Sequence, residues 1–197
     1  MTMLWHAGFA TGIVCAFVLI ATAIMRSSQL PEGANQVGGP FRLTSDSGVA
    51  VTERTYRGKW QLIYFGYTFC PDACPTTLSA IASALDKLGP DADRVQPLFI
   101  TIDPARDTPA VLHDYLGNFD RRIVGLFGDQ PTLNGVEHEF GVYAAKSPGN
   151  GPGDYTLDHT SVLYLFDPDG RFVTGLPGGG TGPALAQALR PYLDKNL

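Results

Sequence analysis

Residues 61–77 read Q-L-I-Y-F-G-Y-T-F-C-P-D-A-C-P-T-T and place two of the chain's three cysteines at one turn. The apolar run over 62–65 is typical of a buried strand, and Pro75 suits the first position of a helix. If Pro75 opens the helix, Cys74 is the N-cap, where the helix dipole favours a thiolate. We therefore predict a strand–turn–helix unit whose Cys70 and Cys74 can form a disulfide or bind one soft metal ion.

The size and charge of the chain restrict its class. With 197 residues, 44% of them hydrophobic and 17% charged, the chain can bury one good core, and we expect one globular domain. The formal net charge of -5 argues against nucleic-acid binding, which normally requires a basic patch.

The N-terminal part of the chain is predicted to be a membrane anchor. Residues 4–25 contain no Asp, Glu, Lys or Arg and are long enough to cross ~30 Å of hydrocarbon. A cleaved secretory signal is the alternative, since residues 21–23 fit the A-x-A cleavage pattern, but the usual positively charged segment is missing. Residues 26–40 are polar, contain Gly and Pro, and are predicted to be a linker, so that the folded domain covers 41–197.

The order of predicted elements indicates an α/β domain. We expect, in chain order, a hairpin over 41–52, a strand over 61–67, a helix over 75–88, a strand over 95–102, a helix starting at Pro109 with Asp107 or Thr108 as its cap, a strand over 123–127, a helix over 132–140 capped by Thr132, strands over 142–145, 155–158, 161–166 and 172–174, and a last helix capped by Thr181. This is the order of a thioredoxin-like fold with an extra N-terminal β-hairpin, preceded by one transmembrane helix.

Strand directions in such a fold bring distant residues together. The strands over 61–67 and 95–102 are expected to be parallel, so their carboxyl ends lie at one edge of the sheet. The strand over 161–166 is expected to run antiparallel beside the first, which brings its amino end to the same edge. The residues that meet there are Cys70, Cys74, Asp103 and His159.

Two thiolates and one imidazole form a soft ligand set, which suits copper. Zinc is the competing metal, but structural zinc almost always has four protein ligands, and Asp103 or Asp158 would have to complete the set. Asp158 is also a candidate to orient the imidazole of His159. The polar stretch over 101–109 is interpreted either as a turn with a helix cap or as a docking surface or outer partner of the metal site.

Three motifs carry a resemblance to a known family: YFGYTFCPDACP over 64–75, TIDPARDTP over 101–109 and DHT over 158–160. From about residue 41 to the end, the chain resembles the Sco/SenC family, membrane-tethered thioredoxin-like copper proteins that help to assemble respiratory cytochrome oxidase. The resemblance implies that Cys70, Cys74 and His159 bind copper, as Cu(I) or Cu(II), and deliver it to the CuA centre of cytochrome c oxidase subunit II.

The resemblance also implies a cellular compartment and further partners. The domain would lie in the bacterial periplasm or the mitochondrial intermembrane space, with the N-terminal helix as a single-pass anchor in the inner membrane. Another copper chaperone or a thioredoxin-like reductant is a further expected partner.

The same residues allow a second function. A thiol-disulfide reductase would keep the subunit II cysteines reduced, with Cys74 as the low-pKa nucleophile and Cys70 as the resolving thiol. Such reductases usually carry C-x-x-C and a proline before the later strand, whereas here the spacing is one residue longer and His159 stands near the proline position. We therefore expect a metal carrier rather than an enzyme, with a peroxiredoxin-like peroxidase as a third option.

Overall fold

A computed structural model describes residues 37–149, 151 and 153–194. The anchor predicted at 4–25 and most of the linker predicted at 26–40 lie outside these residues. Within the described part of the chain, no helix combines the length and the apolar character that crossing a membrane requires. The elements are β1 (Arg42–Ser45), β2 (Ala50–Thr52), β3 (Trp60–Gly66), α2 (Ala73–Leu88), the 3-10 helix η1 (Gly89–Arg94), β4 (Val95–Thr101), α3 (Pro109–Leu116), β5 (Val124–Phe127), α4 (Gln130–Phe140), β6 (Ala144–Pro148), β7 (Tyr155–His159), β8 (Val162–Phe166), β9 (Phe172–Pro177) and α5 (Gly182–Leu193).

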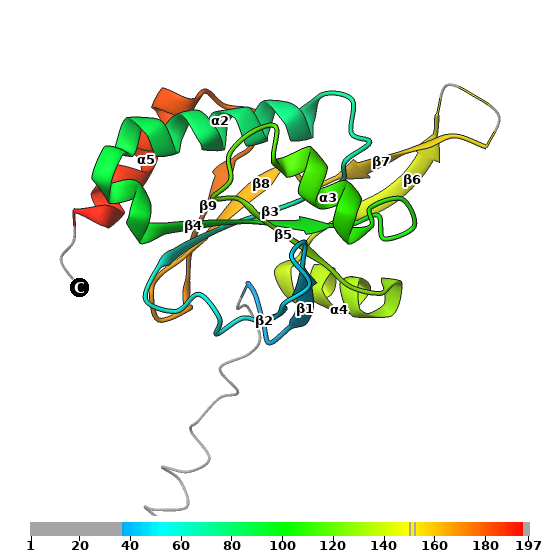
Figure 1. Ribbon diagram of the computed structural model, residues 1–197, viewed down its shortest axis with the longest axis horizontal. Helices are drawn as coiled ribbons and strands as arrows, with labels where there is room; N and C mark the ends of the chain where they lie inside the picture. Colours follow the sequence, from blue (N-terminus) through cyan, green and yellow to red (C-terminus); the bar gives the residue numbers. More distant parts are fainter. Residues whose placement is uncertain (1–36, 150, 152, 195–197) are drawn as a thin grey trace, which may run out of the picture. The chain divides into compact units, whose positions relative to one another are not determined.

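The main sheet has seven strands in the order β2-β1-β5-β4-β3-β8-β9. β3 pairs with β4 in parallel and with β8 in antiparallel register, as predicted. The N-terminal hairpin β1–β2 is also confirmed and joins the sheet through β5. Helices α2 and α5 lie side by side over one face, and α4 covers the other (Figure 1). The mixed α/β, thioredoxin-like arrangement therefore places the turn after β3 at one edge of the sheet.

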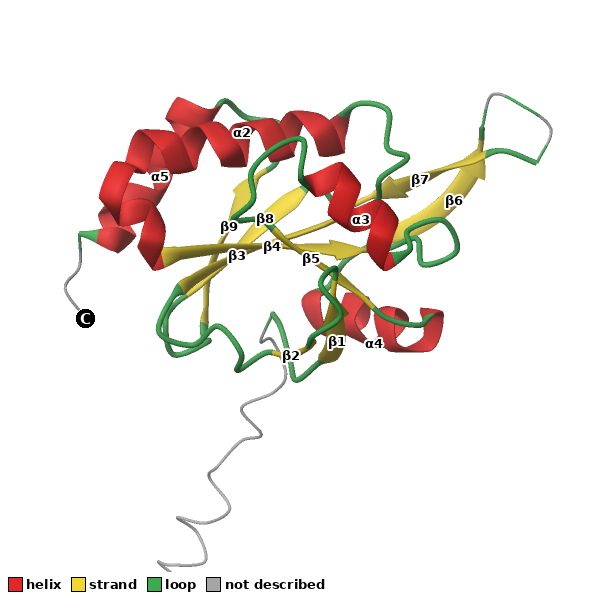
Figure 2. Ribbon diagram, viewed as in Figure 1, coloured by secondary structure: helices red, strands yellow, loops and turns green. Residues whose placement is uncertain are grey.

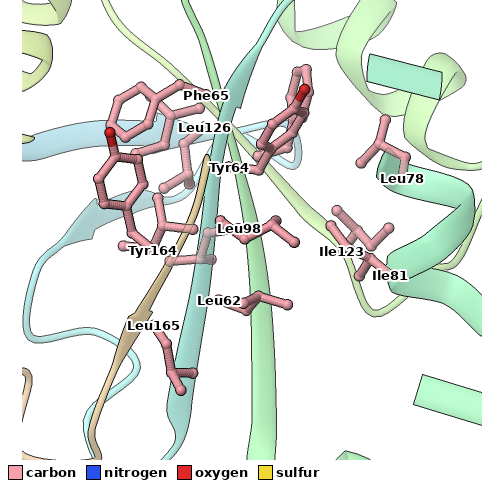
Figure 3. Packing of buried hydrophobic residues seen from close by; sticks show 14 of the residues in the cluster. Leu62, Tyr64, Phe65, Leu78, Ile81, Leu98, Ile123, Leu126, Tyr164 and Leu165 are labelled. Carbon is pink, nitrogen blue, oxygen red and sulfur yellow. The ribbon is translucent and has the colours of Figure 1, made fainter. Parts of the chain in front are cut away.

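β3 is the centre of the core because all seven of its residues are buried. Side chains alternate along a strand, so neighbours face opposite sides of the sheet. Tyr64 points towards α2 and Leu78, whereas Phe65 points to the other face of the sheet (Figure 3). There the ring of Phe65 packs against that of Tyr164, with ring centroids 5.8 Å apart. The run that reads as a buried strand in the sequence is thus covered by helices on both faces.

β6 and β7 form a separate antiparallel ribbon, which projects from the body of the domain (Figure 2). Its register pairs Ala144 with His159 and Pro148 with Tyr155. β6 covers Ala144–Pro148 and so continues past the strand end predicted at 145, because its residues up to Pro148 pair with β7. His159 is therefore the last residue of a ribbon that lies outside the main sheet.

Two of the four predicted helix caps are confirmed. The side chains of Thr108 and Thr181 accept hydrogen bonds from backbone N–H groups in the first turns of α3 and α5. The cap predicted at Thr132 is wrong, because α4 begins two residues earlier, at Gln130. The cap is Asp129, whose carboxylate accepts a hydrogen bond from the N–H of Thr132 at 3.0 Å.

Candidate metal centre

The two cysteines lie at the junction of β3 and α2. The helix starts at Ala73 with Asp72 as its N-cap, so Cys74 is the second helical residue and the prediction that it caps the helix is wrong. Pro75 fits inside the first turn because no intrahelical partner exists there for an N–H. The backbone N–H of Cys74 instead donates to Sγ of Cys70 at 3.3 Å, which fixes both sulfurs at the helix entrance.

His159 reaches this turn from the end of β7. Its Nε2 lies 3.5 Å from Sγ of Cys74, and the ligand atoms of Cys70, Cys74 and His159 all lie within 4.8 Å of one another. No Asp or Glu belongs to this group among the residues that the structure describes. The structure thus brings together the three residues proposed from the sequence, without the carboxylate that a four-ligand zinc site would need.

The two aspartates proposed as outer partners lie elsewhere. Asp158 accepts a hydrogen bond from Oγ of Ser147 at 2.6 Å, on the opposite face of β7 from His159. Nδ1 of His159 lies 3.1 Å from the carbonyl oxygen of Thr160, which takes the place proposed for Asp158. Asp103 is buried and accepts a hydrogen bond from the hydroxyl of Tyr155 at 2.7 Å, so it acts on the ribbon instead of on a sulfur.

Two tyrosines line the site. The hydroxyl of Tyr64 donates to Sγ of Cys74 at 3.8 Å, and its ring lies edge-on to His159 with centroids 6.1 Å apart. The ring of Tyr67 also lies edge-on to the imidazole of His159, with ring centroids 6.0 Å apart. Both belong to the YFGYT motif but were not assigned a role from the sequence. Period-two alternation does predict that Tyr64 faces the same side as Leu62, yet it cannot show that a histidine 95 positions along the chain packs there.

Gly66 lets the strand pass close to the buried sulfur. A Cβ at this position would lie 2.8 Å from Sγ of Cys74 and 2.9 Å from the ring of Phe99, both closer than ordinary contacts. The glycine in the motif is therefore required by packing around the site.

Asp107 anchors the cysteine loop to β4. Its buried carboxylate accepts hydrogen bonds from the N–H and hydroxyl of Thr68, at 3.1 and 2.5 Å, and from the hydroxyl of Thr101 at 2.6 Å. Burial raises the pKa of Asp107, and the hydroxyl donors oppose that effect. The 101–109 stretch is therefore both a helix start, at Thr108, and a support for the loop that carries Cys70.

The two thiols are electrostatically different. The hydrogen bond from the Cys74 thiol holds the pKa of Cys70 well below its usual value, and His159 adds to this effect. The same bond, together with burial, raises the pKa of Cys74. The expectation that Cys74 is the low-pKa thiol is therefore wrong, because the sulfur nearer the helix is the more deeply buried one and donates its proton.

A thioredoxin-like domain with a Cys–Cys–His group at one edge of its sheet defines a class of small metal-site or dithiol proteins. Within that class, residues 29–194 match the SCO1/SenC family model. The human mitochondrial Protein SCO1 homolog is 36% identical over an alignment of 185 residues, which covers 89% of this chain and 60% of the human protein. The chain therefore belongs to the SCO1/SenC family, and it spans about three fifths of the length of this relative.

Solved structures agree with this assignment. ScoI of Bradyrhizobium japonicum with copper bound is 47% identical, with a TM-score of 0.73 over 79% of this chain and 99% of that chain. BsSco, a member of the Sco family of cytochrome c oxidase assembly proteins, has a TM-score of 0.63 over 86% of this chain and all of that chain, at 20% identity, and supports the fold alone.

Proposed function

We propose that this protein is a copper metallochaperone of cytochrome c oxidase assembly, in which Cys70, Cys74 and His159 hold the metal. The observation that carries the proposal is the mutual approach of the three ligand atoms to within 4.8 Å. Thiolate and imidazole are ligands that copper accepts in both oxidation states. The copper-bound ScoI of Bradyrhizobium japonicum, at 47% identity, supports the choice of metal.

A carrier must release its metal, and the two sulfurs differ in a way that suits release. Cys74 is fully buried, whereas Cys70 is only partly buried and lies beside the exposed ring of Phe69. A partner thiolate can approach copper from the Cys70 side. It forms a new sulfur–copper bond as the bond to Cys70 breaks, and His159 and Cys74 follow, with no change in oxidation state.

The destination proposed for copper is the CuA centre of cytochrome c oxidase subunit II. The support is the membership in the SCO1/SenC family, together with the copper-bound structure of ScoI from Bradyrhizobium japonicum at 47% identity. We further propose that residues 4–25 anchor the protein in the inner membrane, with the domain in the periplasm or the intermembrane space. Mitochondrial relatives such as the human SCO1 homolog support the second of these compartments.

Copper titration of the full chain tests the proposal. We expect the wild type to bind one Cu(I) or one Cu(II), and His159→Ala to lose roughly a hundredfold or more in Cu(II) affinity, since a ligand is removed where even an outer partner costs about 10–100-fold. His113→Ala is the matched control, because His113 is exposed and pairs with Asp46 away from the sulfurs. Unchanged Cu(II) affinity in His159→Ala, or no stoichiometric copper in the wild type, contradicts the proposal.

The lowered pKa of Cys70 favours one alternative, a thiol-disulfide reductase acting on the subunit II cysteines. In that reaction the Cys70 thiolate attacks a substrate disulfide, and Cys74 resolves the mixed disulfide as a second thiol is released. The protein is left with a Cys70–Cys74 disulfide, which an added dithiol reductant must reduce before the next cycle. Repeated reduction of an oxidised CuA-loop peptide in the presence of that dithiol, by a protein that retains no copper, would favour this alternative over the carrier.

A further inference from the structure

Arg106 joins the cysteine loop to the β6–β7 ribbon. Its guanidinium carbon lies 3.7 Å from the ring centroid of Tyr155, 4.7 Å from that of Phe69 and 5.6 Å from that of Tyr67. The first ring belongs to the ribbon, and the other two flank Thr68 in the cysteine loop. A planar cation is thus packed between aromatic rings from both halves of the candidate metal centre.

The polar contacts of Arg106 hold the start of β7. Its Nε donates to Oδ2 of Asp103, and Nη1 donates to the carbonyl oxygen of Tyr155 at 2.9 Å. The other oxygen of Asp103 accepts from the hydroxyl of Tyr155 at 2.7 Å, so backbone and side chain of one residue are both fixed. Since Tyr155 and His159 are the two ends of β7, this fixes the strand that presents the imidazole.

The cysteine loop contacts the same strand further along. The N–H of Leu157 donates to the hydroxyl oxygen of Tyr67 at 3.0 Å, and the ring of Tyr67 lies edge-on to His159. Phe69, which directly precedes Cys70, packs its ring against Arg106 although the residue is 57% exposed. The cluster formed by Arg106, Asp103, Tyr155, Tyr67 and Phe69 is called the ribbon clamp below.

One atom of the clamp is left without a partner. Nη2 of Arg106 is buried and has no hydrogen-bond partner among the residues that the structure describes. A buried, unmatched N–H costs free energy, so a residue chosen for stability alone would not leave it there. A lysine would remove the unmatched group and keep the charge, but a single ammonium cannot form the fork between Asp103 and the Tyr155 carbonyl while covering the rings.

We propose that Arg106 is a positioning residue that holds the β6–β7 ribbon against the cysteine loop and so sets the distance of His159 from the two sulfurs. This inference rests on the proposed function, since it concerns the affinity for copper. Cu(I) is satisfied by soft thiolates alone, whereas Cu(II) depends on nitrogen ligands in a defined geometry. Loosening the ribbon should therefore weaken Cu(II) binding much more than Cu(I) binding.

The test compares Arg106→Met and Arg106→Lys with the wild type in the full chain. We expect Cu(II) affinity to fall about 10–100-fold, as for loss of an outer partner, while Cu(I) affinity stays within about threefold. In the metal-free protein, hydrogen exchange of the Leu157 amide should rise about tenfold, since the ribbon opens locally while the core amides of β3 stay protected. The exchange measurement needs no copper and separates a misplaced ribbon from a damaged metal centre.

Arg122→Met is the matched control. Arg122 is also doubly paired, with Asp120 at 2.6 Å and Asp86 at 3.1 Å, but it does not contact the ribbon or the cysteine loop. We expect it to leave both copper affinities and the exchange of the Leu157 amide unchanged.

Four outcomes overturn or separate the claims. Equal losses of Cu(I) and Cu(II), or Arg106 variants that match Arg122→Met in every readout, overturn the positioning role. If Arg106→Met fails to fold, the Arg106→Lys variant alone tests the positioning role. Wild-type copper affinities and wild-type Leu157 exchange in Arg106→Lys also overturn that role. If the wild type itself binds no stoichiometric copper, the proposed function fails, whereas faster Leu157 exchange still supports the clamp.

Discussion

The two halves of the candidate metal centre are held in very different ways. Cys74 lies in the first turn of α2 and is fully buried, with its sulfur against Gly66 of β3. His159 comes from a ribbon in which Leu157 is the one buried residue of both strands. The sulfur half is therefore fixed by the core itself, whereas the imidazole half depends on a few side-chain contacts across a loop. The comparison suggests that the sulfurs are always in place and that the position of the imidazole is adjustable.

The largest effect expected in the sulfur half concerns thiol reactivity. An ordinary thiol is alkylated roughly a hundredfold faster at about pH 8 than at about pH 6, because its thiolate fraction rises tenfold per pH unit. Cys70 is held as a thiolate by the proton that Cys74 donates, so in the metal-free protein its rate should change by less than about threefold over the same range. Peptide mass spectrometry after timed alkylation, in a Cys15→Ser background, measures this.

The control removes the donated proton. In Cys74→Ala the pKa of Cys70 should return towards its ordinary value, and the steep pH dependence of alkylation should return with it. A flat profile in this variant, or a steep one with Cys74 present, would show that the sulfurs are not coupled as the structure implies.

A smaller effect is expected when the packing under Cys74 is changed. Gly66→Ala should destabilise the protein by about 2 kcal/mol, since the new Cβ would lie 2.8 Å from Sγ of Cys74 and the core must shift. It should also weaken Cu(I) and Cu(II) binding together, in contrast to a loosened ribbon. Chemical denaturation and copper titration measure the two effects.

Gly135→Ala is the control for this substitution. Gly135 lies within α4, and a Cβ there would meet nothing within 4 Å. The same change should therefore stabilise the protein, by up to about 1 kcal/mol from helix propensity. A Gly66→Ala protein as stable as the wild type would mean that the sulfur half is less rigid than the comparison assumes.

The same contrast explains what the sequence could predict. The sulfur half follows from local patterns: an apolar strand, a turn and a helix start determine where Cys70 and Cys74 lie to within a residue or two. The error at the helix cap arose because proline is tolerated at any position of the first turn, and here Pro75 is the third helical residue. Strand direction was enough to bring His159 to the same edge.

The ribbon could not be predicted in the same way. Alternation along β7 places Asp158 and His159 on opposite faces, and this rule argues against the role proposed for Asp158. The contacts of Arg106 with Tyr155 and of Tyr67 with Leu157 join segments 49 and 90 positions apart. No local pattern reports such contacts, because they depend on how the ribbon folds back over the loop.

The smallest expected effect sharpens the imidazole half of the comparison. Tyr67→Phe keeps the ring beside His159 but removes the oxygen that accepts the hydrogen bond from the Leu157 N–H at 3.0 Å. Leaving this buried N–H unpaired should lower the free energy of local opening of the ribbon by about 1 kcal/mol. Hydrogen exchange of the Leu157 amide should therefore become roughly fivefold faster. Tyr143→Phe is the matched control, because it removes the same hydroxyl group from a tyrosine that is 64% exposed. Since the sulfurs are held by the core, the alkylation profile of Cys70 should not change in Tyr67→Phe. A change in that profile without faster Leu157 exchange would mean that the hydroxyl acts on the sulfurs, and that the two halves are not held independently.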